Sequence, residues 1–273
     1  MHRPVRAGSF DVHGGSLRYE QSGSGTPVVL LHAFALDRRM WDSQVDVLAQ
    51  RVRVIRYDLR GFGQSIIGPT PYRHADDLLA LLDHLDIDRA FLIGASLGGG
   101  AAINAAVMYP GRVLGLVAVD PSLGGFRWSQ RQNTAMRAIQ ARAGQDGIDA
   151  ARARWLSLPM FRTLAARPEA EARFRAMVAD YSGWHWAHPD PGVPLAPPAI
   201  ERLQDIPVPT LVIVGELDSA DFHDIADTLE RGIPNARKAV LRGVGHLGNM
   251  EAPEQFNALV SAFLAEHDPG PHR

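Results

Sequence analysis

The stretch that decides the fold is Ala90-Phe91-Leu92-Ile93-Gly94-Ala95-Ser96-Leu97-Gly98. Its first four residues form an apolar run that is typical of a buried strand, and residues 97–109 favour a helix of small side chains. Between them, Gly94 to Gly98 fits the pattern G-x-S-x-G. In a strand-turn-helix, this pattern lifts the serine hydroxyl group above the edge of a sheet. We therefore predict a sharp turn with Ser96 at its tip.

Strand-like and helical patterns alternate on both sides of this turn. The patterns predict strands at residues 28–31, 52–57, 90–93 and 114–119, with helices at residues 41–50, 75–85 and 97–109. Such alternation predicts right-handed crossovers and a mostly parallel sheet with helices on both faces, which is the α/β fold class. Residues 9–22 predict an antiparallel edge hairpin that turns at Gly14-Gly15.

The pattern changes after Asp120. Residues 124–198 carry no strand signal, only Ala- and Arg-rich helical stretches followed by a proline-rich connector. Alternation then resumes with a strand at 210–214, a helix at 224–231, a strand at 237–241 and a helix at about 252–266. We therefore predict an α/β core of residues 1–123 and 199–273, with a helical cap inserted at residues 124–198.

The composition excludes several classes of function. The 273 residues are 46% hydrophobic and 21% charged with a net charge of −2, which fits a folded protein rather than a disordered one. No basic stripe of the kind that binds nucleic acid is visible. Cysteine is absent, which rules out disulfides, thiolate catalysis and Cys-based metal sites. With no strongly apolar leader or span, we expect a cytoplasmic protein without membrane contact.

A serine hydroxyl group is a weak nucleophile unless a neighbouring base takes its proton. His246 is the candidate base, because it follows the predicted strand 237–241 and has glycines on its N-terminal side that leave room for the ring. Asp218 is the candidate acid that holds the imidazole, since it follows the predicted strand 210–214 and precedes His246 by 28 residues, about one strand-helix-strand unit. The rival acids are Asp120, Glu216 and Asp221, with Asp120 the next choice.

The negative charge that develops on a substrate carbonyl needs two backbone donors. We predict that one is the N–H group of Leu97, at the start of the helix after the turn. The other is the N–H group of Phe34, in the loop after strand 28–31. His32 precedes Phe34 in this loop, and a bracing role is favoured over a catalytic one.

This constellation resembles the α/β-hydrolase superfamily over nearly the whole chain. The segments that carry the resemblance are residues 31–34, 58–65, 94–98, 215–218 and 245–246. The chain is most similar to the enol-lactonase, esterase and cofactor-free haloperoxidase-like branch with a helical cap. The sequence departs from the family pattern at Ala33, where the family usually has glycine. The added methyl group is expected to narrow the oxyanion loop. Asp58 and Arg60 match a turn of the family that we interpret as structural.

Four of the five tryptophans, Trp128, Trp155, Trp184 and Trp186, lie in the predicted cap. Most apolar side chains there are expected to pack in the interior, and a minority, with these tryptophans as candidates, to line a substrate pocket. The histidines at positions 185 and 188 lack a nearby acidic cluster, so we predict no metal ion. We predict no cofactor either.

Together these features predict a serine hydrolase that cleaves an ester or lactone with an apolar portion through an acyl-enzyme on Ser96. Relatives with a carboxylate at this position form alkyl-ester intermediates, which serine does not provide. Three alternatives stay open: C–C bond hydrolysis, perhydrolysis, and a receptor-like ligand-binding protein with little turnover. The expected partner is a small-molecule substrate, and the oligomeric state is not predicted.

Overall fold

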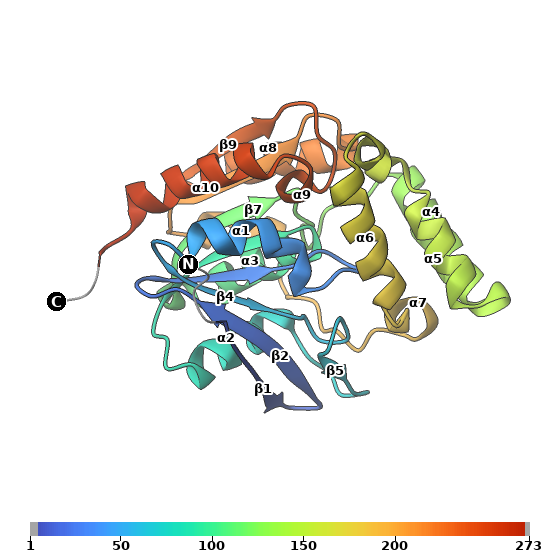
Figure 1. The fold of residues 1–273 in the computed structure, drawn as a ribbon, viewed down its shortest axis with the longest axis horizontal. Helices are drawn as coiled ribbons and strands as arrows, with labels where there is room; N and C mark the ends of the chain where they lie inside the picture. Colours follow the sequence, from blue (N-terminus) through green and yellow to red (C-terminus); the bar gives the residue numbers. More distant parts are fainter. Residues whose placement is uncertain (1–4, 271–273) are drawn as a thin grey trace.

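A single mixed sheet organises the structure, a computed structural model that describes residues 5–270. In these residues the sheet has nine strands in the order β1-β2-β4-β3-β6-β7-β8-β9, with β5 beside β2 (Figure 1). The strands are β1 (Arg6–Val12), β2 (Gly15–Ser22), β3 (Pro27–Leu31), β4 (Arg53–Tyr57), β5 (Ile66–Ile67), β6 (Ala90–Ala95), β7 (Val113–Val119), β8 (Thr210–Gly215) and β9 (Ala236–Leu241).

Six neighbouring strands of the sheet run parallel: β4, β3, β6, β7, β8 and β9. The strand β2 pairs antiparallel with β1, β4 and β5. Every residue of β6 and β8 is buried, as expected for strands covered by helices on both faces. The predicted α/β fold class is confirmed. The hairpin differs in one detail: Val12 pairs with Gly15, so the two-residue turn is His13-Gly14. Gly14 supplies the positive φ of 76° that this tight turn needs, and Gly15 already belongs to β2.

Helices cover both faces of the sheet. The helices α1 and α10 pack against each other on one face, and α2 and α3 pack against each other on the other face (Figure 1). The helices of the core are α1 (Asp42–Leu48), α2 (His74–His84), α3 (Leu97–Met108), α8 (Ala220–Gly232), α9 (Gly248–Glu251) and α10 (Pro253–His267). Short 3₁₀ helices lie at Arg38–Trp41 (η1), Pro110–Arg112 (η2), Ala199–Glu201 (η4) and Leu203–Asp205 (η5).

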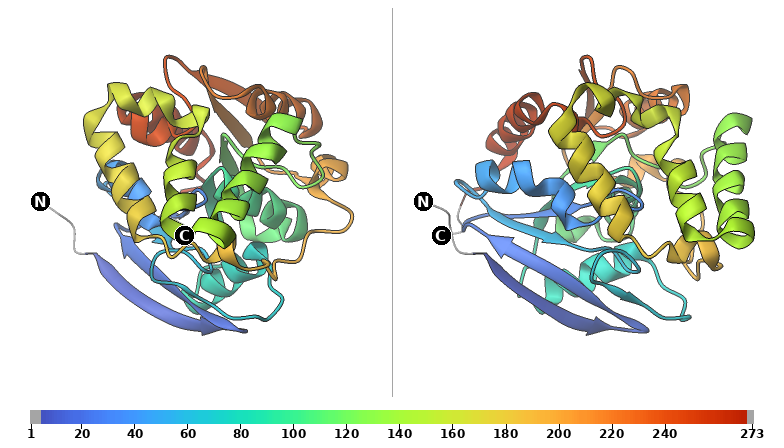
Figure 2. Two further views of the ribbon diagram at one scale, coloured as in Figure 1. Left: turned by 90° about the vertical axis from the view of Figure 1, so that its right-hand side faces the viewer. Right: turned by 45° about the vertical axis from the view of Figure 1, so that its right-hand side comes forward.

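The segment between β7 and β8 is helical, and we call residues 124–198 the helical segment. It comprises α4 (Gln130–Asp146), α5 (Ile148–Leu156), the 3₁₀ helix η3 (Pro159–Ala166), α6 (Pro168–Asp180) and α7 (Trp184–Ala187). Figure 2 shows these helices gathered together on one side of the sheet. Because the segment leaves the sheet after β7, it starts from the edge where the parallel strands end. No helix of residues 5–270 is long and apolar enough to span a membrane.

Candidate active site

Ser96 occupies a strained turn between β6 and α3. Its backbone has φ 50° and ψ −112°, a conformation that side chains rarely adopt and that is typical of functional sites. The flanking glycines make this turn possible. A Cβ atom at Gly94 would lie 2.2 Å from the carbonyl oxygen of Gly98, and one at Gly98 would lie 2.3 Å from that of Leu31. Ser96 is half-buried, so its hydroxyl group is not sealed from solvent.

His246 links Ser96 to Asp218. The Nε2 atom of His246 lies 3.0 Å from the hydroxyl oxygen of Ser96, and its Nδ1 atom lies 2.7 Å from Oδ2 of Asp218. An ionised carboxylate only accepts hydrogen bonds, so Nδ1 carries the proton and Nε2 is free to accept one from Ser96. The structure thus brings together the three side chains predicted from the sequence, from the loops after β6, β8 and β9.

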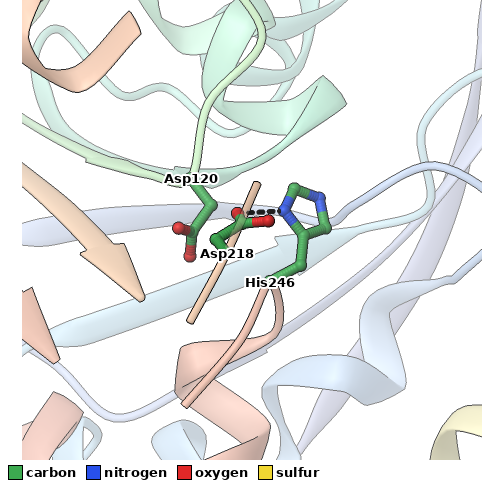
Figure 3. A group of neighbouring side chains, drawn as sticks. All are labelled: Asp120, Asp218 and His246. Carbon is green, nitrogen blue, oxygen red and sulfur yellow. Dashed lines mark hydrogen bonds and ion pairs between the residues drawn. The ribbon is translucent and has the colours of Figure 1, made fainter. Parts of the chain in front are cut away.

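The rival acids lie in different surroundings. Glu216 is exposed, and its Oε2 accepts a hydrogen bond from the N–H group of Gly243 at 2.8 Å. Asp221 accepts one from the hydroxyl group of Ser129 at 2.7 Å. Asp120, in contrast, is buried directly beside Asp218, and Figure 3 shows it together with Asp218 and His246.

These three side chains are the one set of at least three His, Cys, Asp or Glu residues, within 5–270, whose ligand atoms could converge on a metal ion. The atoms all lie within 4.8 Å of one another. However, Asp218 and His246 already hydrogen-bond to each other, and a metal ion would have to break that contact. The absence of a metal site stays a prediction.

The two predicted oxyanion donors are available. Leu97 is the first residue of α3, so its N–H group has no acceptor within the helix. Within the described chain, neither this group nor the N–H group of Phe34 has a hydrogen-bond partner. Both lie beside the site: Phe34 follows β3, which pairs with β6.

His32 braces the loop that carries Phe34. Its side chain is fully buried, and its Nδ1–H group donates to the carbonyl oxygen of Ala33 at 2.8 Å. Its Nε2 atom accepts from the N–H group of Leu59, also at 2.8 Å. Burial lowers the pKa of His32, which keeps the ring neutral in this double role. Ala33 is not among the residues with a positive φ, so its backbone does not need the glycine that the family usually has there.

The four tryptophans of the helical segment lie in different places. Trp155 and Trp186 are buried next to Phe34, with ring centroids 5.3 and 6.3 Å from its ring. Trp128 packs at 5.4 Å against Phe222, whose ring is 4.3 Å from that of His246. Trp184 instead stacks on the ring of His188, which is exposed. Two of the four thus border the predicted oxyanion loop, and one lies a single ring away from the candidate base.

A cavity of about 460 Å³ lies beside the candidate acid. Its wall combines the start of α4, part of η3 and the loop that carries Asp218. Met160 lines this cavity, and its carbonyl oxygen accepts a hydrogen bond from the N–H group of His246 at 3.4 Å. Of the candidate catalytic residues, Asp218 alone lines this cavity.

One buried residue at the site was not anticipated. The side chain of Glu251 is fully buried, and its carboxylate accepts hydrogen bonds from the N–H groups of Gly245 and Leu247, on either side of His246. Arg167 of the helical segment lies 3.4 Å from this carboxylate and donates to the carbonyl oxygens of Glu251 and Gly243. No local sequence signal marks this pair, because its members are 84 residues apart.

Comparison with known proteins identifies the family. A family model described as "alpha/beta hydrolase fold" matches residues 26–253. The chain belongs to the alpha/beta hydrolase fold family. A 2-hydroxy-6-oxononadienedioate/2-hydroxy-6-oxononatrienedioate hydrolase of Paraburkholderia xenovorans is 30% identical over 266 residues, covering 91% of this chain and 90% of that protein.

Two solved structures of this family are also similar. A thermophilic esterase from Thermogutta terrifontis superposes with a TM-score of 0.75 at 30% identity, covering 93% of this chain and 94% of the other. The enol-lactonase from Burkholderia xenovorans superposes with a TM-score of 0.78 at 25% identity, covering 94% of this chain and 100% of the other. The predicted resemblance to the enol-lactonase and esterase branch of the α/β-hydrolases is confirmed. The chain is a hydrolase of this family.

Proposed function

We propose that this hydrolase cleaves a carboxylic ester or lactone through an acyl-enzyme on Ser96. The observation that carries the proposal is the continuous contact from Ser96 through His246 to Asp218, at 3.0 and 2.7 Å. The similarity to an esterase and an enol-lactonase supports the choice of substrate class.

The reaction follows from the positions of these groups. His246 Nε2 takes the hydroxyl proton of Ser96 as the oxygen attacks the substrate carbonyl, and Asp218 stabilises the imidazolium that forms. The N–H groups of Phe34 and Leu97 receive the negative charge on the carbonyl oxygen. His246 then gives its proton to the leaving alkoxide. In the second half, water loses a proton to His246 as it attacks the acyl group, and His246 returns this proton to the Ser96 oxygen as the acid is released.

The aromatic rings around Phe34 support a substrate with an apolar portion. Trp155 and Trp186 surround Phe34 together with Tyr181, which lies 6.0 Å away, so the surroundings of the predicted oxyanion loop are apolar. We assign Trp155 and Trp186, and Trp128 on the side of His246, to the substrate pocket. Trp184 stacks on His188 and reaches Phe34 only through His185, whose ring lies 5.0 Å from that of Trp184 and 5.8 Å from that of Phe34.

The test is covalent labelling with a fluorophosphonate, followed by peptide mapping. We expect one adduct, on Ser96, and none in the Ser96→Ala variant. Turnover of the best ester should fall by about 10⁶ in Ser96→Ala, and adding His246→Ala should cost little more, because the triad acts as a unit. Ser157→Ala is the matched control, since this serine is exposed and its hydroxyl group bonds, among residues 5–270, only to Arg154.

A wild-type protein that takes up no label would contradict the proposal and favour a receptor-like protein. A labelled protein is then offered esters, lactones, a vinylogous diketone with a cleavable C–C bond, and a carboxylic acid with peroxide. Fastest turnover of the diketone or of the peroxide mixture would keep the Ser96 nucleophile but replace the ester assignment.

A further inference from the structure

Asp120 is a buried carboxyl group beside the triad that the proposed mechanism leaves unused. It follows β7, and its side chain lies next to Asp218 and His246 (Figure 3). The titratable groups that act on it are Asp218 and His246, from the loops after β8 and β9, and Glu251 of α9. Two carboxylates this close in a buried place rarely ionise together, as in the paired carboxyls of aspartic proteases.

The hydrogen-bond donors indicate which carboxyl group keeps the charge. Asp218 accepts two hydrogen bonds, from Nδ1 of His246 and from the N–H group of Ser219, both at 2.7 Å. Asp120 accepts one, at Oδ1, from the N–H group of Gly215 at 2.8 Å. Its buried Oδ2 atom has no hydrogen-bond partner that meets normal geometry in residues 5–270. Donors stabilise a carboxylate, so the charge belongs on Asp218 and the proton on Oδ2 of Asp120.

The electrostatics and the backbone agree with this assignment. Burial, and then the charge of Asp218, raise the pKa of Asp120 well above its ordinary value. The backbone of Asp120 has φ 41°, which costs energy for a residue other than glycine. Its N–H group is held by the carbonyl oxygen of Ile213 at 2.8 Å. Hydrogen bonds at the backbone N–H group and at the Oδ1 atom therefore fix the side chain of Asp120 in place.

We propose that Asp120 is a positioning residue: it stays protonated and donates a hydrogen bond from its carboxyl O–H group to the carboxylate of Asp218. The inference rests on the proposed serine-hydrolase function. The O–H group holds Asp218 against rotation and spreads its negative charge. The proton of Ser96 moves to His246 and on to the leaving group, while the proton of Asp120 stays where it is.

Two substitutions separate this role from its alternatives. Asp120→Asn keeps an acceptor for Gly215 and a donor for Asp218, so we expect kcat within about 3-fold of wild type and an unchanged acid limb of kcat/KM. Asp120→Ala removes both. We expect kcat to fall about 10-fold, because Asp218 is no longer held against rotation. We also expect the acid limb of kcat/KM to move up by about half a pH unit, because an Asp218 carboxylate with one donor fewer stabilises the imidazolium of His246 more strongly. A role in packing alone would lower stability without moving the limb.

An ionised Asp120 gives the opposite sign. In that case Asp120→Asn removes a negative charge beside His246, and the acid limb moves down by roughly one pH unit. That shift, or a loss of turnover in Asp120→Asn that approaches the factor of about 10⁴ expected for Asp218→Asn, would overturn the proposal.

Infrared difference spectroscopy counts the proton directly and needs no substrate. Near neutral pH, we expect the spectrum of wild type minus Asp120→Asn to contain the carbonyl band of a protonated carboxyl group. Asp37→Asn is the matched control, because hydrogen bonds from Arg39 lower the pKa of Asp37 even though burial opposes its charge. Its difference spectrum should lack that band.

The two hypotheses fail separately. If fluorophosphonate does not label Ser96 but the infrared band is present, the hydrolase proposal falls and the protonated Asp120 remains. If labelling succeeds and the band is missing, Asp120 is ionised and this inference is wrong. If the band is present but Asp120→Ala keeps the wild-type pH profile, the positioning role is wrong.

Discussion

Three residues other than glycine adopt left-handed backbone conformations around the candidate site: Ala35, Ser96 and Asp120, with φ of 59°, 50° and 41°. Each costs on the order of 1–3 kcal/mol, which the surroundings must offset. At Ser96, the N–H group donates to Val119, and the carbonyl oxygen accepts from the N–H groups of Gly100 and Ser122. The position of the nucleophile is therefore set by backbone contacts rather than by its own side chain.

The turn at Ser96 needs glycine at position 94 for steric reasons, and this requirement can be tested by substitution. Gly94→Ala would place a methyl group 2.2 Å from a backbone oxygen that cannot move away without displacing α3. We expect the free energy of unfolding to fall by about 3 kcal/mol or more, measured by urea denaturation. Gly144→Ala is the control: it lies in α4 with no atom near its added Cβ, and it should gain about 1 kcal/mol. Equal effects would mean that the turn is not sterically constrained.

Single residues differed in how well the sequence could predict them. Ser96, Asp218 and His246 each follow a strand with a recognisable pattern, so topology alone brings their loops together. The contact between Asp120 and Asp218 could not be predicted, because it depends on side-chain rotamers and on a backbone φ that no residue type requires. The sequence offered Asp120 only as a rival acid.

Among the elements, the predicted limits of the parallel strands and of most core helices lie within two residues of the observed ones, and the exception is the start of α8. The buried strands are short apolar runs bounded by polar residues, and observed and predicted limits agree closely. The helix α8 begins at Ala220 rather than at residue 224, and its buried face starts with Asp221 and Phe222. The sequence interpretation places these residues in the loop after Asp218. The orientation of Trp184 was equally unreadable, since the short helix α7 has no periodicity to assign a face.

The contact between Arg167 and the loop of His246 gives a prediction about two elements. Arg167→Ala removes the cation beside the buried Glu251 carboxylate and the hydrogen bonds to Glu251 and Gly243. We expect unfolding by urea to require about 2 kcal/mol less, with kcat lowered more than KM is raised, because the loop that holds the base loosens. Arg175→Ala, which breaks an exposed pair with Glu171 on α6, should change stability by less than about 0.5 kcal/mol. Similar losses in both variants would contradict a specific role for Arg167.

Two histidines, His74 and His185, should each lower the stability of the molecule in mild acid, while a protonated Asp120 opposes them over the same pH range. Burial lowers the pKa of His74 to about 3 and that of His185 to about 4. Between an ordinary pKa of about 6.5 and these values, the unfolded chain binds protons that the folded chain does not, so stability falls as the pH falls. Each histidine should cost about 2 kcal/mol by about pH 5, measured by chemical denaturation at a series of pH values.

A variant isolates one of these contributions. His74→Phe keeps a ring beside Tyr72 and should reduce the loss of stability between neutral pH and about pH 5 by about 2 kcal/mol. The exposed His188 serves as control, because a solvated side chain changes its surroundings little on folding, and His188→Gln should keep the full slope. If His74→Phe has the wild-type slope, acid sensitivity arises elsewhere.

The anchoring of His246 to the helical segment limits how this protein can be re-engineered. The N–H group of His246 donates to the carbonyl oxygen of Met160, and Arg167 holds the residues on either side of that loop. A chimera that exchanges residues 124–198 to obtain a new specificity would therefore also replace the contacts of Met160 and Arg167 that support its own base. Grafts that retain residues 160–167 from this chain offer a route to new selectivity with the proton-transfer machinery intact.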